Sequence, residues 1–184
     1  TMAAIIALPD EKVEEICAAV NAEGEVCVPA NYNCPGQVSC AGNTGEIDAF
    51  CEAIKAAGGR AVKLPVSGAF HTPYMKDVEP VLRTALEKMP LQAPQIPVYA
   101  NRTAGLYPAD REGITSLLSE QVCHAVRWED TLRAMAADGI DTFVEVGAGA
   151  TLTGFVRRTL PDATALTVND FPSYEAVLKE LLGD

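Results

Sequence analysis

Residues 65–76, PVSGAFHTPYMK, contain the best candidate for acid–base chemistry in this sequence. His71 is one of only two histidines in the 184-residue chain, and imidazole is the side chain that exchanges protons most readily near neutral pH. Phe70 supplies an apolar wall beside the ring, and Thr72 followed by Pro73 has the pattern of a helix start. A histidine placed in this way can act as a general base at the edge of a pocket. The alternative is a half-buried histidine whose ring bonds a backbone carbonyl and has no catalytic role.

A second polar cluster lies in the segment NYNCPGQ, residues 31–37. Its Asn, Pro and Gly residues predict the central turn of a hairpin. Asn31, Asn33 and Gln37 place three side-chain amides in this segment. The segment can be simply a turn, but the amides also suit the amides and hydroxyls of an extended polar ligand.

The cysteines offer no pattern for a metal site. The six cysteines form no CxxC pair, and with the two histidines far apart they give no zinc-ligand spacing. We expect core thiols rather than disulfides, and Cys34 and Cys40, in or near the predicted loop, are the candidates for reactive thiols. The sequence therefore predicts no metal.

Composition excludes several classes of protein. The chain is 48% hydrophobic and 21% charged, as is ordinary for a soluble globular protein. Its formal net charge of −11 argues against a general nucleic-acid binder. No apolar run approaches the roughly 20 residues that span a bilayer, and the N-terminus lacks the order of a signal peptide. We expect a cytoplasmic protein with no membrane partner.

The elements that must position His71 begin with two short amphipathic helices. Their apolar positions are Val13, Ile16, Cys17 and Val20 in the first, and Ile47, Phe50, Cys51 and Ile54 in the second. Strand-like runs cover residues 2–8, 25–29, 37–40 and 60–66. The order βαββαβ predicts that residues 1–66 form a ferredoxin-like subdomain, an antiparallel sheet with both helices on one face.

Residues 60–66 are also apolar enough for a strand buried on both faces. A helical pattern follows them, at Met75, Val78, Leu82 and further apolar positions up to Met89. We therefore expect His71 at a strand-to-helix crossover, at the end of a sheet where ligands gather in open α/β folds.

The rest of the chain alternates strands and helices in the pattern of a parallel α/β layer. We predict strands at 96–103, 142–146 and 163–168, and helices at 110–122, 128–138 and 174–181, with a further helix after the glycine turn, ending near residue 158. Gly147 and Gly149 lie in a turn that lacks the third glycine of a dinucleotide fingerprint and the Lys-Ser/Thr of a P-loop. Close packing of helix on strand is therefore favoured over phosphate binding.

Five segments in this order and spacing resemble malonyl-CoA:acyl carrier protein transacylases and the related polyketide acyltransferase domains. They are MAAIIAL, NYNCPGQV, VSGAFHTPYM, QVCHAVRW and EVGAGATLTG. The family's chain is longer and carries a nucleophile motif, GHSxG, and a substrate-binding arginine upstream. No G-x-S-x-G occurs in these 184 residues. The resemblance implies a C-terminal part of the enzyme, with residues 67–184 belonging to a large α/β-hydrolase-like acyltransferase domain.

The resemblance also implies an activity, the transfer of malonyl from coenzyme A to the phosphopantetheine thiol of acyl carrier protein. It implies a Ser-His dyad in which His71 is the base and a backbone carbonyl near Gln121 orients the imidazole. Ala125 departs from the family, which often has proline there, and His124 adds a second ring nearby. The coenzyme A thioester is the substrate, so no cofactor is expected.

Further roles follow from the same resemblance. Phe70, in the sequence AFH, implies selection of malonyl over methylmalonyl, and Asn31, Asn33 and Gln37 would contact the pantetheine or acyl end. We expect this chain alone to be inactive and to associate with the missing N-terminal segment or with itself. A thioester hydrolase on the same scaffold and a non-catalytic ferredoxin-like binding or scaffold module are the alternatives.

Overall fold

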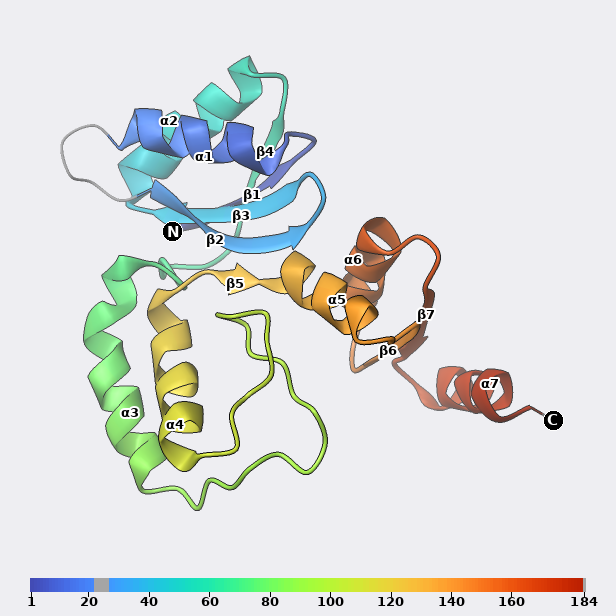
Figure 1. Ribbon diagram of the computed structural model, residues 1–184. Helices are drawn as coiled ribbons and strands as arrows, with labels where there is room; N and C mark the ends of the chain where they lie inside the picture. Colours follow the sequence, from blue (N-terminus) through green and yellow to red (C-terminus); the bar gives the residue numbers. More distant parts are fainter. Residues whose placement is uncertain (22–26, 184) are drawn as a thin grey trace. The chain divides into compact units, whose positions relative to one another are not determined.

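The computed structural model describes residues 1–21 and 27–183 (Figure 1). It divides into two compact units, Thr1–Thr131 and Leu132–Asp184, which we describe separately. The first unit begins with β1 (Met2–Ile6), α1 (Asp10–Val20), β2 (Cys27–Cys34), β3 (Gln37–Gly42), α2 (Thr44–Ala56) and β4 (Arg60–Lys63). It continues with the 3₁₀ helix η1 (Pro73–Val78), α3 (Glu79–Glu87), α4 (Arg111–Glu120), the 3₁₀ helix η2 (Gln121–Cys123), β5 (Val126–Arg127) and the start of α5 (Trp128–Ala137).

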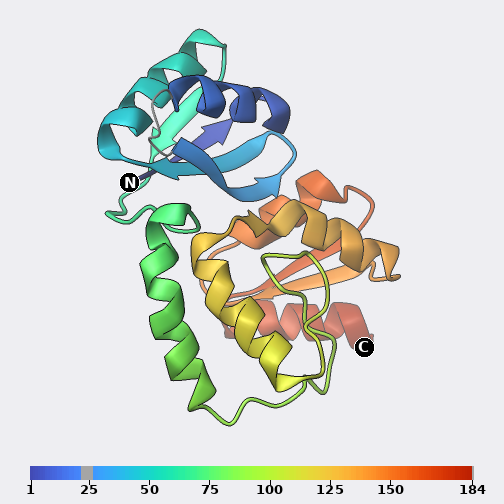
Figure 2. The ribbon, with the colours of Figure 1, turned by 60° about the vertical axis from the view of Figure 1, so that its left-hand side comes forward.

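The sheet of the first unit has the strand order β4-β1-β3-β2-β5. Its first four strands are antiparallel, and β5 runs parallel to β2 with Asn31 opposite Val126. The helices α1 and α2 lie side by side on one face of the sheet (Figures 1 and 2). The predicted element order of residues 1–66 is therefore confirmed, and β5 is an additional strand that the sequence pattern did not indicate.

The core of this unit lies between the two helices and the sheet. The apolar stripes predicted for α1 and α2 are buried there, except that Val20 is only partly buried, and they pack on β1, β2 and β3. The buried members are Ala3, Ile5, Val13, Ile16, Cys17, Cys27, Val38, Cys40, Ile47, Phe50, Cys51 and Ile54. Removing one large apolar side chain from water contributes roughly 1.5–3 kcal/mol, so these stripes are what holds both helices to the sheet.

The prediction that residues 60–66 form a strand buried on both faces is wrong. β4 is a short strand at the sheet edge, it pairs antiparallel with β1, and its Val62 is 45% exposed. His71 consequently follows an antiparallel edge strand rather than a strand of a parallel sheet. Apolar composition alone cannot separate an edge strand from a central one, because both carry β-branched residues.

The hairpin turn is shorter than predicted. Asn31 and Asn33 lie inside β2, and the turn consists of Pro35 and Gly36, whose φ of 70° is in the left-handed region open to glycine. The strand β2 absorbs its extra residues in two register shifts, between Pro29 and Asn31 and between Tyr32 and Cys34. Glu25, where we expected this strand to begin, lies outside the described residues.

The expectation of reactive thiols at Cys34 and Cys40 is also wrong. Their side chains are 1% and 0% exposed, and all six cysteines are buried thiols outside any disulfide, as expected for core thiols. For Cys51, burial raises the pKa of the thiol. A buried thiol that stays protonated is a poor nucleophile.

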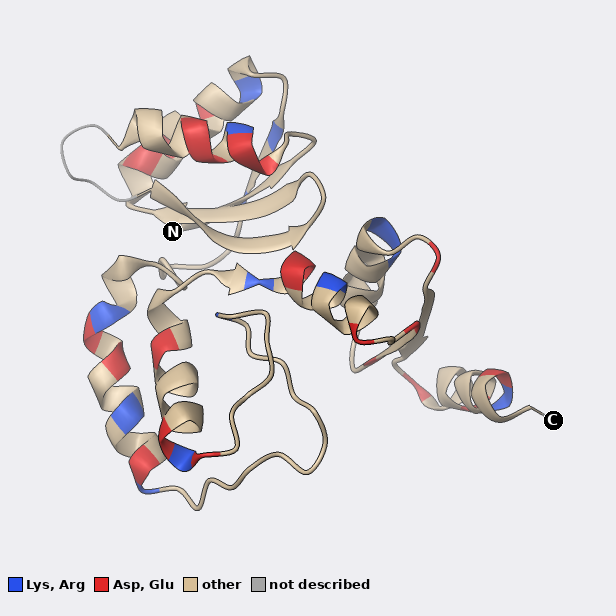
Figure 3. Ribbon diagram, viewed as in Figure 1, with Lys and Arg blue, Asp and Glu red and all other residues tan. Residues whose placement is uncertain are grey.

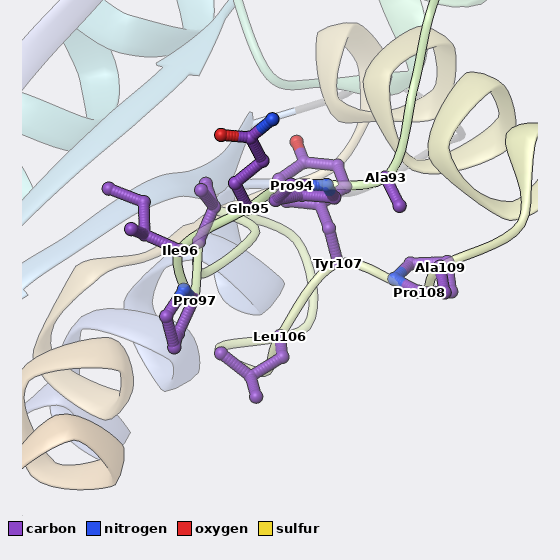
Figure 4. A pocket seen from close by; sticks show the side chains of 10 residues that line it. Ala93, Pro94, Gln95, Ile96, Pro97, Leu106, Tyr107, Pro108 and Ala109 are labelled. Atoms are coloured by element: carbon purple, nitrogen blue, oxygen red, sulfur yellow. The ribbon is translucent and has the colours of Figure 1, made fainter.

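The predicted strand at 96–103 does not form. Residues 93–99 follow an irregular path, and only a bridge between Tyr99 and Leu106 pairs this segment with its neighbour. Pro97 interrupts the run, because proline has no N–H for a ladder. Residues 93–98 and 106–109 instead line a largely apolar pocket of about 290 Å³ (Figure 4).

The second unit is built on a two-stranded parallel sheet. The strands β6 (Thr142–Val146) and β7 (Thr164–Val168) pair in register, with Thr142 opposite Thr164, and α6 (Thr151–Thr159) and α7 (Phe171–Leu182) pack on them. The predicted strands and helices of this region are confirmed. Gly147 and Gly149 adopt φ values of 141° and 92°, so the turn before α6 requires glycine.

Glu145 explains why that glycine turn is not a phosphate site. Its carboxylate accepts hydrogen bonds from Leu152 N (3.2 Å), Thr153 N (2.7 Å) and Thr153 Oγ1 (2.7 Å). The bond from the Thr153 N–H is the main cause that lowers the pKa of Glu145. The N–H groups that an anion would need at the start of α6 are therefore already used by the protein's own carboxylate.

Candidate active site

His71 is held by two carbonyl groups of one short turn. Its backbone N–H donates to Val122 O at 3.1 Å, and its ring atom Nδ1 lies 2.8 Å from Gln121 O. The backbone of His71 has φ of 61°, a left-handed conformation that costs a non-glycine residue roughly 1–3 kcal/mol. A strained backbone of this kind persists only where neighbouring groups hold it in place. Here the two carbonyl groups of η2 hold the backbone N–H and the ring of His71.

The contact with Gln121 determines which ring nitrogen carries the proton. A carbonyl oxygen only accepts, so Nδ1 of the neutral ring is the donor and Nε2 keeps its lone pair. Within the described part of the chain, no residue bonds Nε2, and His71 is only half-buried. A ring in this state can take a proton at Nε2, which is what a general base must do.

The residues after His71 start a helix as predicted, but of a different kind. Thr72 is fully buried, and its Oγ1 donates to Ala69 O at 2.7 Å and accepts from Tyr74 N at 3.3 Å, with Pro73 in the first position of η1. The predicted single helix is divided into η1 and α3. Pro80 explains the break, because it has no N–H to continue the helical ladder.

The turn η2 follows α4, which ends two residues before the predicted end at Val122. The side chain of Gln121 accepts a hydrogen bond at Oε1 from Asn101 Nδ2, at 3.2 Å. Cys123 donates its thiol proton to Glu79 Oε2 at 3.2 Å, which connects η2 to the start of α3. Sequence reasoning missed Asn101, Glu79 and Cys123. Asn101 lies in the segment wrongly predicted as a strand, so its side chain was not considered as a partner of Gln121.

His124, the second histidine, is bonded to the end of α4. Its Nδ1 lies 2.7 Å from Glu120 O, so it too carries its proton on Nδ1. Desolvation and then the charge of Arg102 lower the pKa of His124, while Glu79 opposes them. This ring contacts η2 from outside and does not contact His71 in the described structure.

The predicted ligand-binding amides are not gathered in one loop. Asn31 and Asn33 lie on β2, next to β5, and Asn33 Nδ2 donates to Ser39 Oγ at 3.3 Å. Gln37 lies at the start of β3, opposite Ile6 of β1. The two asparagines therefore share a strand whose neighbour, β5, follows the η2 turn, and Gln37 lies across the hairpin turn from them, opposite Cys34.

Phe70 projects beside the candidate base. Its side chain is 43% exposed, and a Cβ added to Gly68 would come within 2.9 Å of the Phe70 ring. Glycine at position 68 therefore leaves the room in which the ring lies. Phe70 thus directly precedes the candidate base, and its ring is partly exposed and lies against Gly68.

Two other properties bear on the chemistry of the described residues. Among them, no group of three or more His, Cys, Asp and Glu side chains could hold a metal ion. Their helices include none with the length and apolar character to cross a membrane.

Comparisons with known proteins agree on one family. The acyl transferase domain matches residues 2–178. The malonyl CoA-acyl carrier protein transacylase of Escherichia coli K12 is 38% identical over 181 residues, which cover 98% of this chain and 58% of that protein. The polyketide biosynthesis protein ThaF of Burkholderia thailandensis is 37% identical over 161 residues, 87% of this chain and 14% of that protein.

Solved structures give the same result. An acyl carrier protein S-malonyltransferase from Vibrio cholerae has a TM-score of 0.90 and 37% identity over 96% of this chain and 57% of its own. A malonyl-transacylase solved in complex with a type II PKS acyl-carrier protein has a TM-score of 0.93 and 33% identity, over 97% of this chain and 58% of its own. The chain thus spans 58% of the E. coli protein that it matches.

Proposed function

This chain belongs to the acyl transferase domain family, and we propose on that basis that it supplies the general base of a malonyl transferase. The reaction moves a malonyl group from coenzyme A to the phosphopantetheine thiol of acyl carrier protein, in fatty-acid or polyketide biosynthesis. The observation that carries the proposal is the ring of His71, with its Nδ1 proton on the Gln121 carbonyl and Nε2 left to accept a proton. The names of the relatives favour transfer over a hydrolase or a non-catalytic binding module.

His71 would act in a dyad with a serine that the family resemblance places outside these residues. As the serine oxygen attacks the thioester carbonyl, Nε2 takes the serine proton. The C–S bond then breaks, and Nε2 returns the proton to the sulfur of coenzyme A. In the second half, the carrier thiol gives its proton to Nε2 and attacks the acyl-serine ester, and the serine oxygen leaves with that proton.

The Gln121 carbonyl would have two effects on this cycle. By holding the ring at Nδ1, it would leave Nε2 for the reacting atoms. It also accepts a stronger hydrogen bond from Nδ1 when the ring becomes positively charged. A carbonyl would thus take the part that an aspartate has in a Ser-His-Asp triad.

We further propose roles for the other predicted residues. Phe70 would limit the space beside the α-carbon of the acyl group, which supports malonyl over methylmalonyl. Asn31, Asn33 and Gln37 would bond the pantetheine or acyl end. The coenzyme A thioester is a substrate, no cofactor is needed, and the protein would be cytoplasmic.

The domain description is also a proposal. The strand order β4-β1-β3-β2 with two helices on one face supports a ferredoxin-like subdomain over residues 1–66. The parallel pair β6–β7 supports the assignment of residues 67–184 to an α/β-hydrolase-like domain. Exposed Val144 and Val146 on β6 suit association with the remaining part of that domain.

The test is His71→Ala in a full-length enzyme that contains this segment, with malonyl transfer from malonyl-CoA to acyl carrier protein as the assay. We expect a loss of at least roughly 10²–10⁴-fold, because a positioned base contributes that much. His124→Ala is the matched control and should stay within a few-fold, since that ring bonds only the outside of the turn. Near-normal turnover of His71→Ala in a folded protein would refute the assignment.

A further inference from the structure

Asn101 connects the turn that holds His71 to the sheet. Its side-chain Nδ2 donates to Gln121 Oε1 at 3.2 Å, and its backbone oxygen accepts from Arg127 N, in β5, at 2.8 Å. We infer that Asn101 is a positioning residue, which fixes Gln121 so that the carbonyl of the same residue holds the proton of His71 on Nδ1. The inference rests on the proposed role of His71 as a base.

The η2 turn needs such support because it is short. It consists of Gln121–Cys123, and a single 3₁₀ turn has weaker internal hydrogen bonds than an α-helix. The oxygen of Gln121 has only a long contact inside the turn, 3.4 Å from His124 N, against 2.8 Å to His71 Nδ1. The direction of this carbonyl is therefore determined mainly by contacts from outside η2.

Asn101 is itself rigidly placed. Ala100 is almost fully buried, its N–H donates to Gly105 O at 2.7 Å, and its oxygen accepts from Ala104 N at 2.9 Å. Ala104 completes this tight turn with a left-handed φ of 55°. The backbone of Asn101 is thus already ordered by this turn, so only the rotamer freedom of its side chain is lost when it bonds Gln121.

The same residue also connects the base to the strand of the predicted amides. Arg127, whose N–H bonds Asn101 O, lies opposite Tyr32 in β2, and its neighbour Val126 lies opposite Asn31. Asn101 therefore joins the turn that orients the base to the strand that carries Asn31. With this connection intact, the base and the candidate substrate-binding strand keep a fixed spacing.

Cys123 also supports η2, through its bond to Glu79, but it is the weaker candidate for this role. A thiol is a weak donor, and Cys123 lies two residues beyond Gln121, whose carbonyl meets the His71 ring. Asn101 acts on Gln121 directly. The position of the His71 proton should therefore respond to Asn101.

The experiment is a proton–nitrogen correlation NMR spectrum of the histidine rings, recorded on the 184-residue chain, which has only two histidines. This spectrum shows which ring nitrogen carries the proton, and it needs no activity. In the unchanged protein, both His71 and His124 should be Nδ1–H. In Asn101→Ala, we expect His71 to lose this preference and become a mixture with Nε2–H, while His124 stays Nδ1–H.

Three further variants separate positioning from a general structural role. Gln121→Ala keeps the carbonyl but removes the side-chain partner, so it should change His71 as Asn101→Ala does, and the double variant should change it no further. Asn101→Asp should restore Nδ1–H, because the Gln121 amide can turn and donate to the new carboxylate. Thr103→Ala alters the same turn, where its hydroxyl accepts from Gly105 N, without contact to Gln121, and should leave His71 unchanged.

Two results would overturn the inference. One is a folded Asn101→Ala or Gln121→Ala protein in which His71 remains Nδ1–H. The other is an equal change at His71 and His124, which would show that the whole turn rearranges. These results do not depend on the outcome of the activity test. If the spectra are as expected but the full-length enzyme transfers no malonyl, the proposed function is refuted and the positioning role of Asn101 stands.

Discussion

Asp10, the first residue of α1, should make the stability of the first unit depend on pH. Its Oδ1 is buried and has no hydrogen-bond partner among the described residues. It lines a pocket of about 410 Å³ together with Glu11, Glu14, Tyr32, Ala125, Arg127 and Asp130. Burial first, and then the negative charges of Glu129, Glu11, Glu14 and Asp130, raise the pKa of Asp10 to about 6. The acidic residues of α1 and of the start of α5 are visible in Figure 3.

The sign follows from proton linkage. The folded protein holds the proton of Asp10 up to about pH 6, whereas the unfolded chain releases it near pH 3.8. This group therefore does not oppose folding below about pH 4, it makes folding progressively less favourable between about pH 4 and 6, and its effect is constant above that range. A shift of this size corresponds to about 3 kcal/mol, and solvent screening of the partly exposed carboxyl reduces it to about 1–1.5 kcal/mol.

The perturbation is Asp10→Asn, which removes the charge and keeps the shape. Its gain in the free energy of unfolding should be near zero at pH 4 and reach about 1–1.5 kcal/mol above pH 6.5. Urea unfolding followed by the fluorescence of Trp128, the only tryptophan, measures it between pH 4 and 8. Asp77→Asn, which removes an exposed carboxylate outside this cluster, is the control and should show no such trend. A gain that is the same at pH 4 and pH 8, or a loss at pH 8, would refute the reasoning.

Two further predictions concern the core and the acyl pocket. Phe50→Ala empties a fully buried position on α2 and should lower the free energy of unfolding by about 3–5 kcal/mol. The control is Phe171→Ala, at a position 68% exposed, which should change the free energy of unfolding by no more than about 0.5 kcal/mol. Equal losses in urea unfolding would contradict the assigned core. Phe70→Ser in the full-length enzyme should raise the rate with methylmalonyl-CoA relative to malonyl-CoA by roughly 10- to 200-fold, measured by competition between the two thioesters. An unchanged ratio of the two rates would contradict the proposal that Phe70 lies beside the acyl group.

Local patterns predicted most of the elements correctly. The stripes ending at Val20 and Ile54 indicate amphipathic helices because burial of one helix face recurs every three or four residues. Thr72 and Pro73 mark a helix start because the hydroxyl and the missing N–H meet the needs of the first turn. Errors arose where the answer depends on neighbours: residues 60–66 lie at a sheet edge, and the segment 96–103 forms no strand.

The candidate base could be found from the sequence, but the contacts that hold its ring could not. His71 was selected by residue type and by the resemblance of its surrounding motif, and the carbonyl near Gln121 was implied by that resemblance alone. The strained backbone of His71 and the bond from Asn101 gave no signal in the sequence. A backbone oxygen has the same chemistry in every residue, so no pattern of side chains reveals which one will meet a ring fifty positions away.

The sequence by itself determined which segments are amphipathic, where helices can begin, and that a histidine flanked by Phe70 and Thr72 is a candidate for proton transfer. Those properties depend on residues within a few positions of each other. Only the tertiary structure decided that β5 pairs with β2, that Asn31 and Asn33 belong to a strand, and that η2 meets His71. These contacts depend on which distant segments bury their apolar surface against each other, and that is determined by the fold as a whole.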